Sequence, residues 1–276
     1  MVALLAPTVV VLVALTIYPL VYSVKVSFET PSGSPTLQNF TRLVSDQFFF
    51  SALAHTFVYA AIALTVEFVL GLGLALLLDS RIRARNVWRT LLLVPMMLPP
   101  VVVGVVWRLM LNSNFGAVNG TLKTVGVNAD ALTWTASPTL AMASVIIADV
   151  WQWTPFMFLI LLAGLQAIPQ EPYEAALTDG SNAWQTFRHV TLPLLKPAIL
   201  IALLLRTMDL LRVFDHIFIL TEGGPGFATE TLSLYIYRAA FRFSNFGYAA
   251  AMSFVLLIIT NLISAGYIRL LQRREA

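Results

Sequence analysis

Ionisable residues interrupt a long apolar stretch of this 276-residue chain, "ALLLRTMDLLRVFDHIFIL". They are Arg206, Asp209, Arg212, Asp215 and His216. A charge near the centre of a membrane helix costs about 2.5 to 3.5 kcal/mol on an insertion scale, so such residues face a bundle interior or a watery path. On one continuous helix, the three-residue spacings would let opposite charges pair. The pattern indicates either a polar wall of a solute pathway or an ion-pair network that only fixes helix packing.

A second apolar stretch, "IIADVWQWTPFMF", places a carboxylate, an amide and two aromatic rings on one helical face. These residues are Asp149, Gln152, Trp153 and Phe156, at positions i, i+3, i+4 and i+7. Carboxylate and amide groups can hydrogen-bond sugar hydroxyls, while a sugar ring can lie on Trp153. Trp151 and Trp153 near the end of a span are also typical of an interfacial aromatic belt, which stays open as an alternative. In an earlier apolar stretch, Glu67 is a lone carboxylate that we expect to hydrogen-bond a neighbour.

The elements that position these residues must be membrane helices. Hydrophobic residues make up 58% of the chain and charged residues 11%, whereas a soluble domain carries about 25% charged residues. A bilayer core needs roughly 20 apolar residues per helix. Six spans fit this length, at about 3–26, 52–78, 89–110, 138–165, 195–220 and 246–270. The chain has no Cys, and its three His are scattered, so we expect neither a thiolate nucleophile nor a metal site.

Basic residues in the short connectors predict the orientation of the spans. They are Arg81, Arg83 and Arg85 in the second connector, Arg188 and Lys196 in the fourth, and Arg269, Arg273 and Arg274 in the tail. With six spans, these three segments fall on one side, which the positive-inside rule makes cytoplasmic. Both termini are then cytoplasmic. We attribute the net charge of +3 to these connectors and expect no nucleic-acid partner.

The polar passage "EAALTDGSNAWQTFRHVTLPLLKP" lies on that cytoplasmic side. Pro172 can occupy the first turn of a helix that Gly180 ends in the left-handed conformation. A second short helix is expected to begin at the cap Ser181 and to stop at Pro193 and Pro197. The result is a compact helix-turn-helix foot, which could be a docking surface or could lie on the membrane or on its own bundle.

The same passage resembles a known family. Its residues Glu174, Ala175, Ala176, Gly180, Val190, Leu192 and Pro193 match the EAA loop of the permease subunits of binding-protein-dependent ABC importers. Ser181 and Val190 stand where that family usually has Ala and Ile. The passage "FDHIFILTEGGPGFATETLSLYIYRAAF", followed by "GYAAAMS", is similar to the sugar-importing branch, of the maltose and glycerol-phosphate type. The resemblance extends from "YPLVYSVKVSF" to the last span.

This resemblance implies an all-α polytopic membrane protein with the type I ABC importer permease fold. It would form a single domain over 1–276, with six transmembrane helices and a cytoplasmic coupling helix in the EAA loop at about 166–194. The expected contacts with an ATP-hydrolysing subunit are Glu174, Ala175, Ala176, Asp179 and Gly180. The expected substrate pathway comprises Asp149, Gln152, Trp153, Phe156, Asp209, Arg212 and Asp215.

The resemblance also implies a transport subunit without catalytic residues or a cofactor of its own. No Gly is followed by Lys, so the chain has no phosphate-binding GxxxxGK[ST] loop, and ATP and Mg²⁺ would be used by a partner. The expected partners are a second permease subunit, two ATP-binding subunits, membrane lipid and an extracytoplasmic solute-binding protein. That protein would dock on the connectors at 29–48, 111–137 and 221–245 and deliver a sugar, oligosaccharide or polyol. The expected location is a bacterial or archaeal cytoplasmic membrane.

Three other functions remain as alternatives. The first is an ABC importer for a non-sugar solute, and only the resemblance of the passage "GGPGFATETLSLYIY" to sugar importers argues against it. A proton-coupled secondary transporter would use the intramembrane Asp, Arg and His residues as a relay, but paired interrupted helices in two halves are not evident. A polytopic membrane enzyme would need a nucleophile or metal set near one interface, and neither Cys nor clustered His residues are present.

Overall fold

The computed structural model describes residues 2–30, 32–80, 83–126, 128 and 132–272, and this part of the chain is helical, with one isolated β-bridge between Glu29 and Pro35. The helices are α1 (Val2–Ser27), α2 (Gln38–Ser45), α3 (Gln47–Asp79), α4 (Arg85–Met97), α5 (Pro100–Met110), α6 (Ala117–Thr124), α7 (Pro138–Gln166), α8 (Glu171–Thr178), α9 (Ala183–Thr186), α10 (Leu192–Leu210), α11 (Asp215–Leu220), α12 (Leu232–Tyr237) and α13 (Phe246–Gln272). Two π-helical segments, η1 (Phe187–Thr191) and η2 (Arg238–Arg242), adjoin α10 and α12. Arg81, Arg273 and Arg274 lie outside the described residues.

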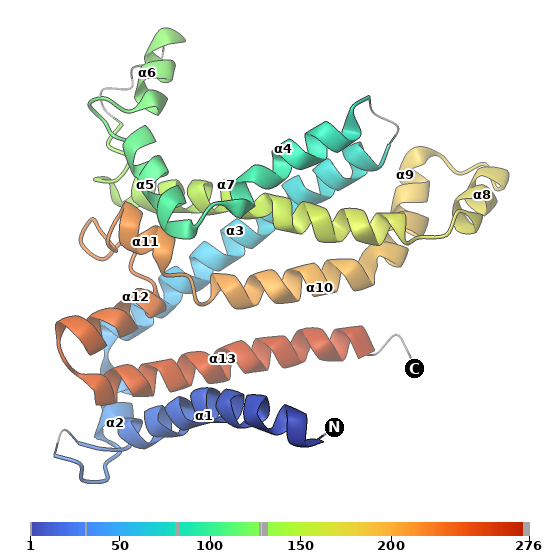
Figure 1. The fold of residues 1–276 in the computed structure, drawn as a ribbon. Coiled ribbons are helices and arrows are strands. Elements are labelled where there is room, and N and C mark those ends of the chain that lie inside the picture. Colours follow the sequence, from blue (N-terminus) through green and yellow to red (C-terminus); the bar gives the residue numbers. More distant parts are fainter. Residues whose placement is uncertain (1, 31, 81–82, 127, 129–131, 273–276) are drawn as a thin grey trace.

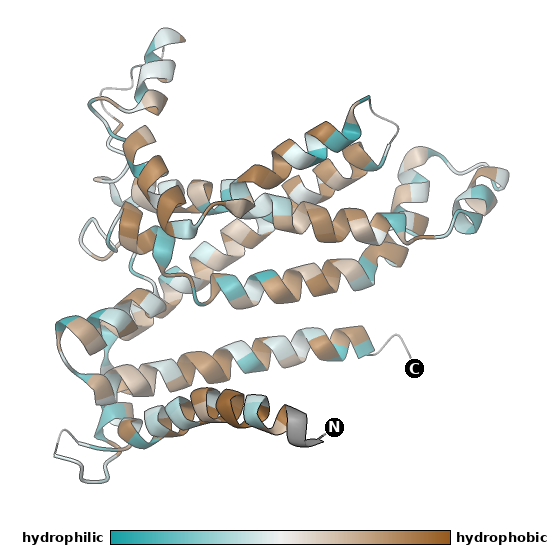
Figure 2. Ribbon diagram, viewed as in Figure 1, coloured by the Kyte–Doolittle hydropathy of each residue, from teal (hydrophilic) through white to brown (hydrophobic). Residues whose placement is uncertain are grey.

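Five continuous helical stretches of the described chain are long and apolar enough to cross a membrane. They are residues 5–27, α3, α7, the run from Ala183 to Leu210, and α13. The pair α4 and α5 makes a sixth if it counts as one bent span. Figure 2 shows apolar residues along these helices and polar residues at the chain reversals, as expected for helices in lipid.

The helices run between two ends of the molecule (Figure 1). One end, the foot end, carries α8, α9, the end of α3, the start of α4, the start of α1 and the end of α13. The opposite end, the loop end, carries α2, α6, α11 and α12. The connectors at 29–48, 111–137 and 221–245 therefore share the loop end, as far as their residues are described.

Helices α3 and α7 form the central pair of the bundle. A Cβ atom added at Gly71 would lie only 2.9 Å from the Cβ atom of Met157. The absence of a side chain at Gly71 therefore lets the backbones of α3 and α7 approach closely. Ala75, one turn further along α3, is fully buried. This close contact holds Glu67 of α3 and Asp149 of α7 at fixed positions in the interior.

The expected span at 89–110 is divided into two helices. Helix α4 ends at Met97 and α5 begins at Pro100, and the two are bent by 94°. The cause is the sequence Leu98-Pro99-Pro100, because a residue before proline is pushed out of the α-helical region. Leu98 and Pro99 both have ψ of 138°.

The expected span at 195–220 is also divided, because α10 ends at Leu210 and α11 begins at Asp215. The N–H of Arg212 bonds the carbonyl of Asp209, as in a tighter final turn. The side chain of Arg212 donates from Nε to the carbonyl of Met208 at 3.0 Å and so satisfies a group that the helix end leaves free. Arg212, Asp215 and His216 are consequently not on the same helix as Arg206.

The prediction that the second short helix of the foot ends at Pro193 and Pro197 was wrong, because one helical run extends from Ala183 to Leu210. Pro193 cannot donate to the preceding turn, and the π-helical segment η1 widens the chain just before it, with the N–H of Leu192 bonding the carbonyl of Phe187. The N-cap of this run is Asn182 instead of Ser181, and it forms a capping box with Gln185.

Candidate functional site

Arg206 of α10 lies at the centre of a buried ion-pair network. Its Nε and Nη2 donate to Oε2 and Oε1 of Glu67 at 2.6 and 2.9 Å, and Nη2 also donates to the carboxylate of Asp149. The exposed fractions of Arg206, Glu67 and Asp149 are 2%, 0% and 1%. The expectation that Glu67 hydrogen-bonds a neighbour is confirmed. Arg206 of α10 pairs with residues of α3 and α7 and not with Asp209 on its own helix. The spacing of charges along one helix cannot predict such pairs between helices.

Gln152 connects this network to the α4–α5 break. Its Nε2 donates to the Leu98 carbonyl at 2.7 Å, one of the backbone groups that the break exposes. Its Oε1 lies 2.6 Å from Nε2 of His216 in α11. Since an amide oxygen only accepts, that histidine nitrogen carries the hydrogen. The other ring nitrogen of His216 lies 3.8 Å from Oδ1 of Asp149.

A pocket of about 350 Å³ opens beside the network and is called the pathway pocket below. Its lining residues are Pro100, Asp149, Trp153, Arg206, Asp209, Arg212, Val213, Phe214, Asp215 and His216. It thus brings together Asp149, Trp153, Asp209, Arg212 and Asp215 from the predicted pathway set. Gln152 and Phe156 do not line it. Gln152 is buried behind it, and the ring of Phe156 packs edge-on against Trp153 at 6.2 Å.

The pathway pocket offers both charge signs and one aromatic face. Arg212 and Asp209 are 3.5 Å apart at its rim, with side chains 58% and 47% exposed. The guanidinium of Arg206 lies 5.0 Å from the ring centre of Trp153, which places this ring in the pocket. Trp151, by contrast, is 41% exposed and packs on Trp107. Such a combination can hydrogen-bond hydroxyl groups in several directions while an indole covers an apolar ring face.

The foot is formed by α8 and the start of the Ala183–Leu210 run. Gly180 ends α8 with φ of +74°, as predicted, and the N–H of Ser181 bonds the carbonyl of Ala176 at 2.9 Å. Of the predicted contact residues, Glu174, Ala175, Asp179 and Gly180 are exposed. Ala176 is only 7% exposed and packs inside the foot, so its side chain is not available to a partner.

The exposed surface of the foot also carries two large apolar side chains. Leu177 is 72% exposed and Trp184 is 66% exposed, and the Trp184 ring packs on Phe187 at 5.7 Å. Tyr173 instead packs against the core between α7 and α10. Because α9, η1 and α10 are one helical run, part of the foot and Arg206 belong to the same helical stretch.

A cluster at the loop end was not anticipated from the sequence. Asp46 caps α3 by accepting from the backbone N–H of Phe48 at 2.9 Å, and its Oδ2 accepts from the hydroxyls of Tyr235 and Tyr248. Burial alone would raise the pKa of Asp46, but hydrogen bonds from these groups outweigh it and lower the pKa below 3.8. The signal that could have revealed the cap is an Asp directly before an apolar run.

Comparison with known proteins places these features in a family context. The family described as "Binding-protein-dependent transport system inner membrane component" matches residues 67–276. The chain is 40% identical over 233 residues to the trehalose/maltose transport system permease protein MalF of Thermococcus litoralis, covering 84% of this chain and 78% of that protein. It is 34% identical to the sulfoquinovosyl glycerol transport system permease protein SmoG of Agrobacterium fabrum, covering 99% and 91%.

Solved structures share the fold. A bacterial ABC transporter involved in the import of the acidic polysaccharide alginate superposes with a TM-score of 0.87 at 24% identity, covering 98% of this chain and 94% of that chain. An amino acid ABC transporter superposes with a TM-score of 0.58 at 20% identity, covering 86% and 99%. The much higher score of the first indicates that the arrangement of helices follows the polysaccharide transporter more closely.

Proposed function

The chain belongs to the family of binding-protein-dependent transport system inner membrane components, and we propose that it is the multi-pass permease subunit through which an ATP-driven importer moves a sugar or polyol. The transport systems named for its relatives carry trehalose or maltose and sulfoquinovosyl glycerol. The pathway pocket supports a similar solute, because it combines carboxylates and guanidinium groups with the face of Trp153.

The observation that carries the proposal is the continuous helix from the foot to the pathway pocket. One helical run from Ala183 to Leu210 joins the foot to Arg206, and Arg206 binds α3 and α7 through Glu67 and Asp149. A movement imposed on the foot must therefore displace α10 against the pocket wall. This is the mechanical requirement for a motor that acts from outside the membrane.

In this proposal, a separate subunit binds ATP and Mg²⁺ and grips the exposed foot. Glu174 and Asp179 form the polar part of the contact, Ala175 and Gly180 add small exposed positions beside them, and Leu177 adds an apolar side chain that is 72% exposed. Ala176, on the buried side of α8, supports the contact by packing inside the foot. Two such ATP-binding subunits and a second permease subunit complete the transporter.

We further propose that the foot end faces the cytoplasm and the loop end faces outward. The described basic residues Arg83, Arg85, Arg188 and Arg269 belong to connectors or helix ends at the foot end. A solute-binding protein would then dock at the loop end on the connectors at 29–48, 111–137 and 221–245. A solved relative by fold was crystallised with its alginate pentasaccharide-bound periplasmic protein.

The direct test is reconstitution with the permease, ATPase and solute-binding protein encoded beside this chain, followed by measurement of ATP-dependent uptake for a panel of labelled sugars. Leu177→Ala and Glu174→Ala should reduce copurification of the ATPase and uptake together, while the matched exposed change Leu37→Ala at the loop end should leave ATPase copurification unchanged. Uptake that proceeds without ATP would overturn the proposal in favour of a secondary transporter.

A further inference from the structure

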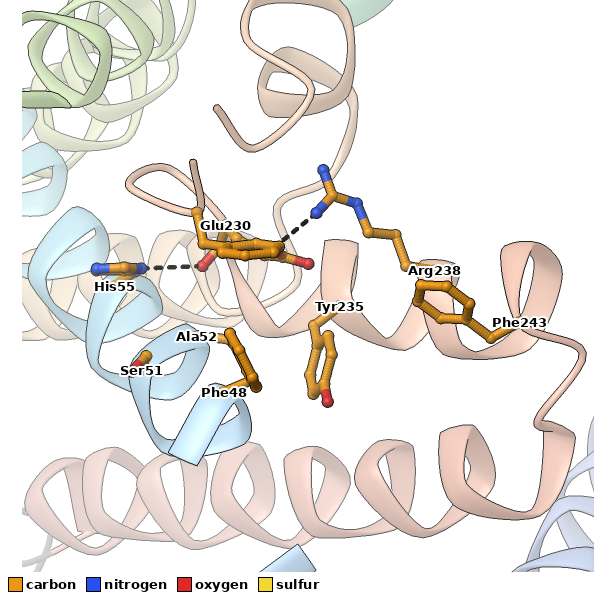
Figure 3. Close-up of a pocket in the computed structure, with 9 residues that line it drawn as sticks. Phe48, Ser51, Ala52, His55, Glu230, Tyr235, Arg238 and Phe243 are labelled. Carbon is orange, nitrogen blue, oxygen red and sulfur yellow. Dashed lines mark hydrogen bonds and ion pairs between the residues drawn. The ribbon is translucent and has the colours of Figure 1, made fainter. Parts of the chain in front are cut away.

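A second pocket, called the outer pocket below, lies at the loop end, between α3 and the chain from Phe227 to Phe243 (Figure 3). Its volume is about 210 Å³. None of its lining residues lines the pathway pocket, so the two pockets are separate. The helical run from the foot to Arg206 does not include any residue of the outer pocket. The proposed coupling therefore does not explain the residues that line this pocket.

Glu230 is the polar residue that most needs a partner. It is only 3% exposed, and its Oε2 accepts from Nη1 of Arg238 at 2.8 Å. Its Oε1 is buried and has no hydrogen-bond partner in the described part of the chain. A buried acceptor without a donor is destabilising, and such groups in native proteins usually meet a donor from water or from a ligand. In Figure 3, the Glu230 side chain lies between His55 and Arg238, within the ring of lining residues.

His55 and Ser51 add polar atoms one helical turn apart on α3. The Nδ1 of His55 lies 3.3 Å from the backbone carbonyl of Glu230, so this nitrogen carries the hydrogen. Ser51 is exposed and also lines the outer pocket. Because Glu230 and Arg238 neutralise each other, the outer pocket favours a neutral ligand that donates O–H groups over an ion.

Aromatic rings form most of the remaining wall. The rings of Phe48 and Phe227 meet edge-on at 5.3 Å, and the guanidinium of Arg238 lies 5.8 Å from Phe227. Tyr235 and Phe243 line the opposite side (Figure 3). Ring faces next to hydrogen-bond acceptors suit a ligand with C–H faces and hydroxyl edges, which is the chemistry of a pyranose ring.

We propose that the outer pocket binds one pyranose ring of a free saccharide, with a hydroxyl donating to Oε1 of Glu230 and the ring lying on Phe48 or Phe227. The inference rests on the proposed sugar-import function and adds a second sugar site at the loop end. A saccharide released at that end would meet this site before the pathway pocket.

The chain has no Cys, which allows a site-specific test. Ser51→Cys places a single thiol at the mouth of the outer pocket. The assembled transporter, without its solute-binding protein, is reacted in lipid nanodiscs with a maleimide, with trehalose, maltose or buffer added. The sugar that the transporter imports should slow labelling at position 51 and leave labelling unchanged in Ser45→Cys, an exposed position at the same end.

A second substitution tests the role of Glu230. Glu230→Gln in the Ser51→Cys background should raise the half-protecting sugar concentration about tenfold, as expected for loss of a hydrogen bond to a charged acceptor. Glu222→Gln is the matched control, since its carboxylate is 55% exposed and its partner Arg242 is 3.9 Å away. Equal protection in both variants would overturn the assignment of Glu230.

The outcomes separate this inference from the proposed function. ATP-dependent sugar uptake without sugar protection at position 51 would overturn only the outer sugar site. A thiol that is unreactive even without sugar would also overturn it, because another subunit would then cover the outer pocket. Failure of uptake for every sugar in the complete transporter would overturn the proposed function, and the outer site with it.

Discussion

Arg206 and Glu67 form a two-pronged ion pair across α10 and α3, with N–O distances of 2.6 and 2.9 Å and both side chains out of solvent. A planar guanidinium matches a carboxylate in this geometry, whereas an ammonium group cannot. Asp149 shares the same guanidinium, so one cation serves two buried carboxylates. Helices α3, α7 and α10 are thereby tied at one point beside the pathway pocket.

Removal of Arg206 should destabilise the protein strongly. Arg206→Ala leaves Glu67 and Asp149 buried without their cation, and breaking a buried pair in this way costs about 3 to 5 kcal/mol. The exposed pair offers a matched control, because Arg212→Ala removes a guanidinium whose side chain is 58% exposed and should cost about 1 kcal/mol or less. Thermal unfolding in detergent measures both, and equal losses would contradict the structural role of the network.

Gln152→Leu should weaken the α4–α5 break. The change leaves the Leu98 carbonyl and the His216 ring without their partners, at a cost of about 1 to 3 kcal/mol for buried groups. Gln166→Leu, at the exposed end of the same helix, should change stability by about 0.5 kcal/mol or less. Comparison of the two midpoints of thermal unfolding tests this. If Gln152→Leu matches the control, the hydrogen bonds do not hold the break.

Substitutions of the exposed pocket carboxylates should affect transport more than stability. Asp215 and Asp209 line the pathway pocket but are accessible to solvent, so Asp215→Asn and Asp209→Asn should shift stability by about 0.5 kcal/mol or less. If they contact the solute, each lost charge-assisted hydrogen bond should lower uptake about tenfold. Uptake and ATPase copurification are measured together. Unchanged uptake in both variants would show that Asp209 and Asp215 do not contact the solute.

Gly180→Val should disturb the foot without disturbing the bundle. A branched residue is strained at φ of +74°, by about 1 to 2 kcal/mol, whereas the site itself is open. We expect reduced ATPase copurification and uptake, with a loss of stability no larger than this strain. Gly180→Asn is the conservative control, because asparagine tolerates this conformation. An equal loss of copurification in both variants would contradict backbone strain as the cause.

The cap at Asp46 should make stability depend on pH. Burial, which would raise its pKa, is outweighed by hydrogen bonds from Tyr248, Tyr235 and the backbone, so the folded-state pKa lies below 3.8. The ionised form therefore stabilises the fold above that pH, and the contribution is lost as the pH falls through the folded-state value. The midpoint difference between the unsubstituted protein and Asp46→Asn should be largest near about pH 7 and shrink below about pH 4. Tyr235→Phe should reduce this pH dependence, and a pH-independent difference would contradict it.

The class of the protein and several local features follow from the amino-acid sequence alone. Apolar runs specify membrane helices because lipid cannot hydrogen-bond the backbone. Gly180 specified the end of α8 because only glycine adopts the left-handed conformation without strain. The charges near Arg206 indicated an interior site, because an ion in contact with lipid is too costly. Each of these conclusions depends on a residue and its immediate neighbours.

Which side chains contact one another depends on the tertiary structure. Arg206 binds Glu67 across 139 positions of sequence, although Asp209 lies one turn away on the same helix. Gln152 binds the Leu98 carbonyl only because two prolines break the chain there, and Glu230 of the outer pocket meets His55 of α3 from a distant loop. Such pairings depend on how packed helices are rotated and where they end. Many distant side chains set that rotation together, and no local pattern contains it.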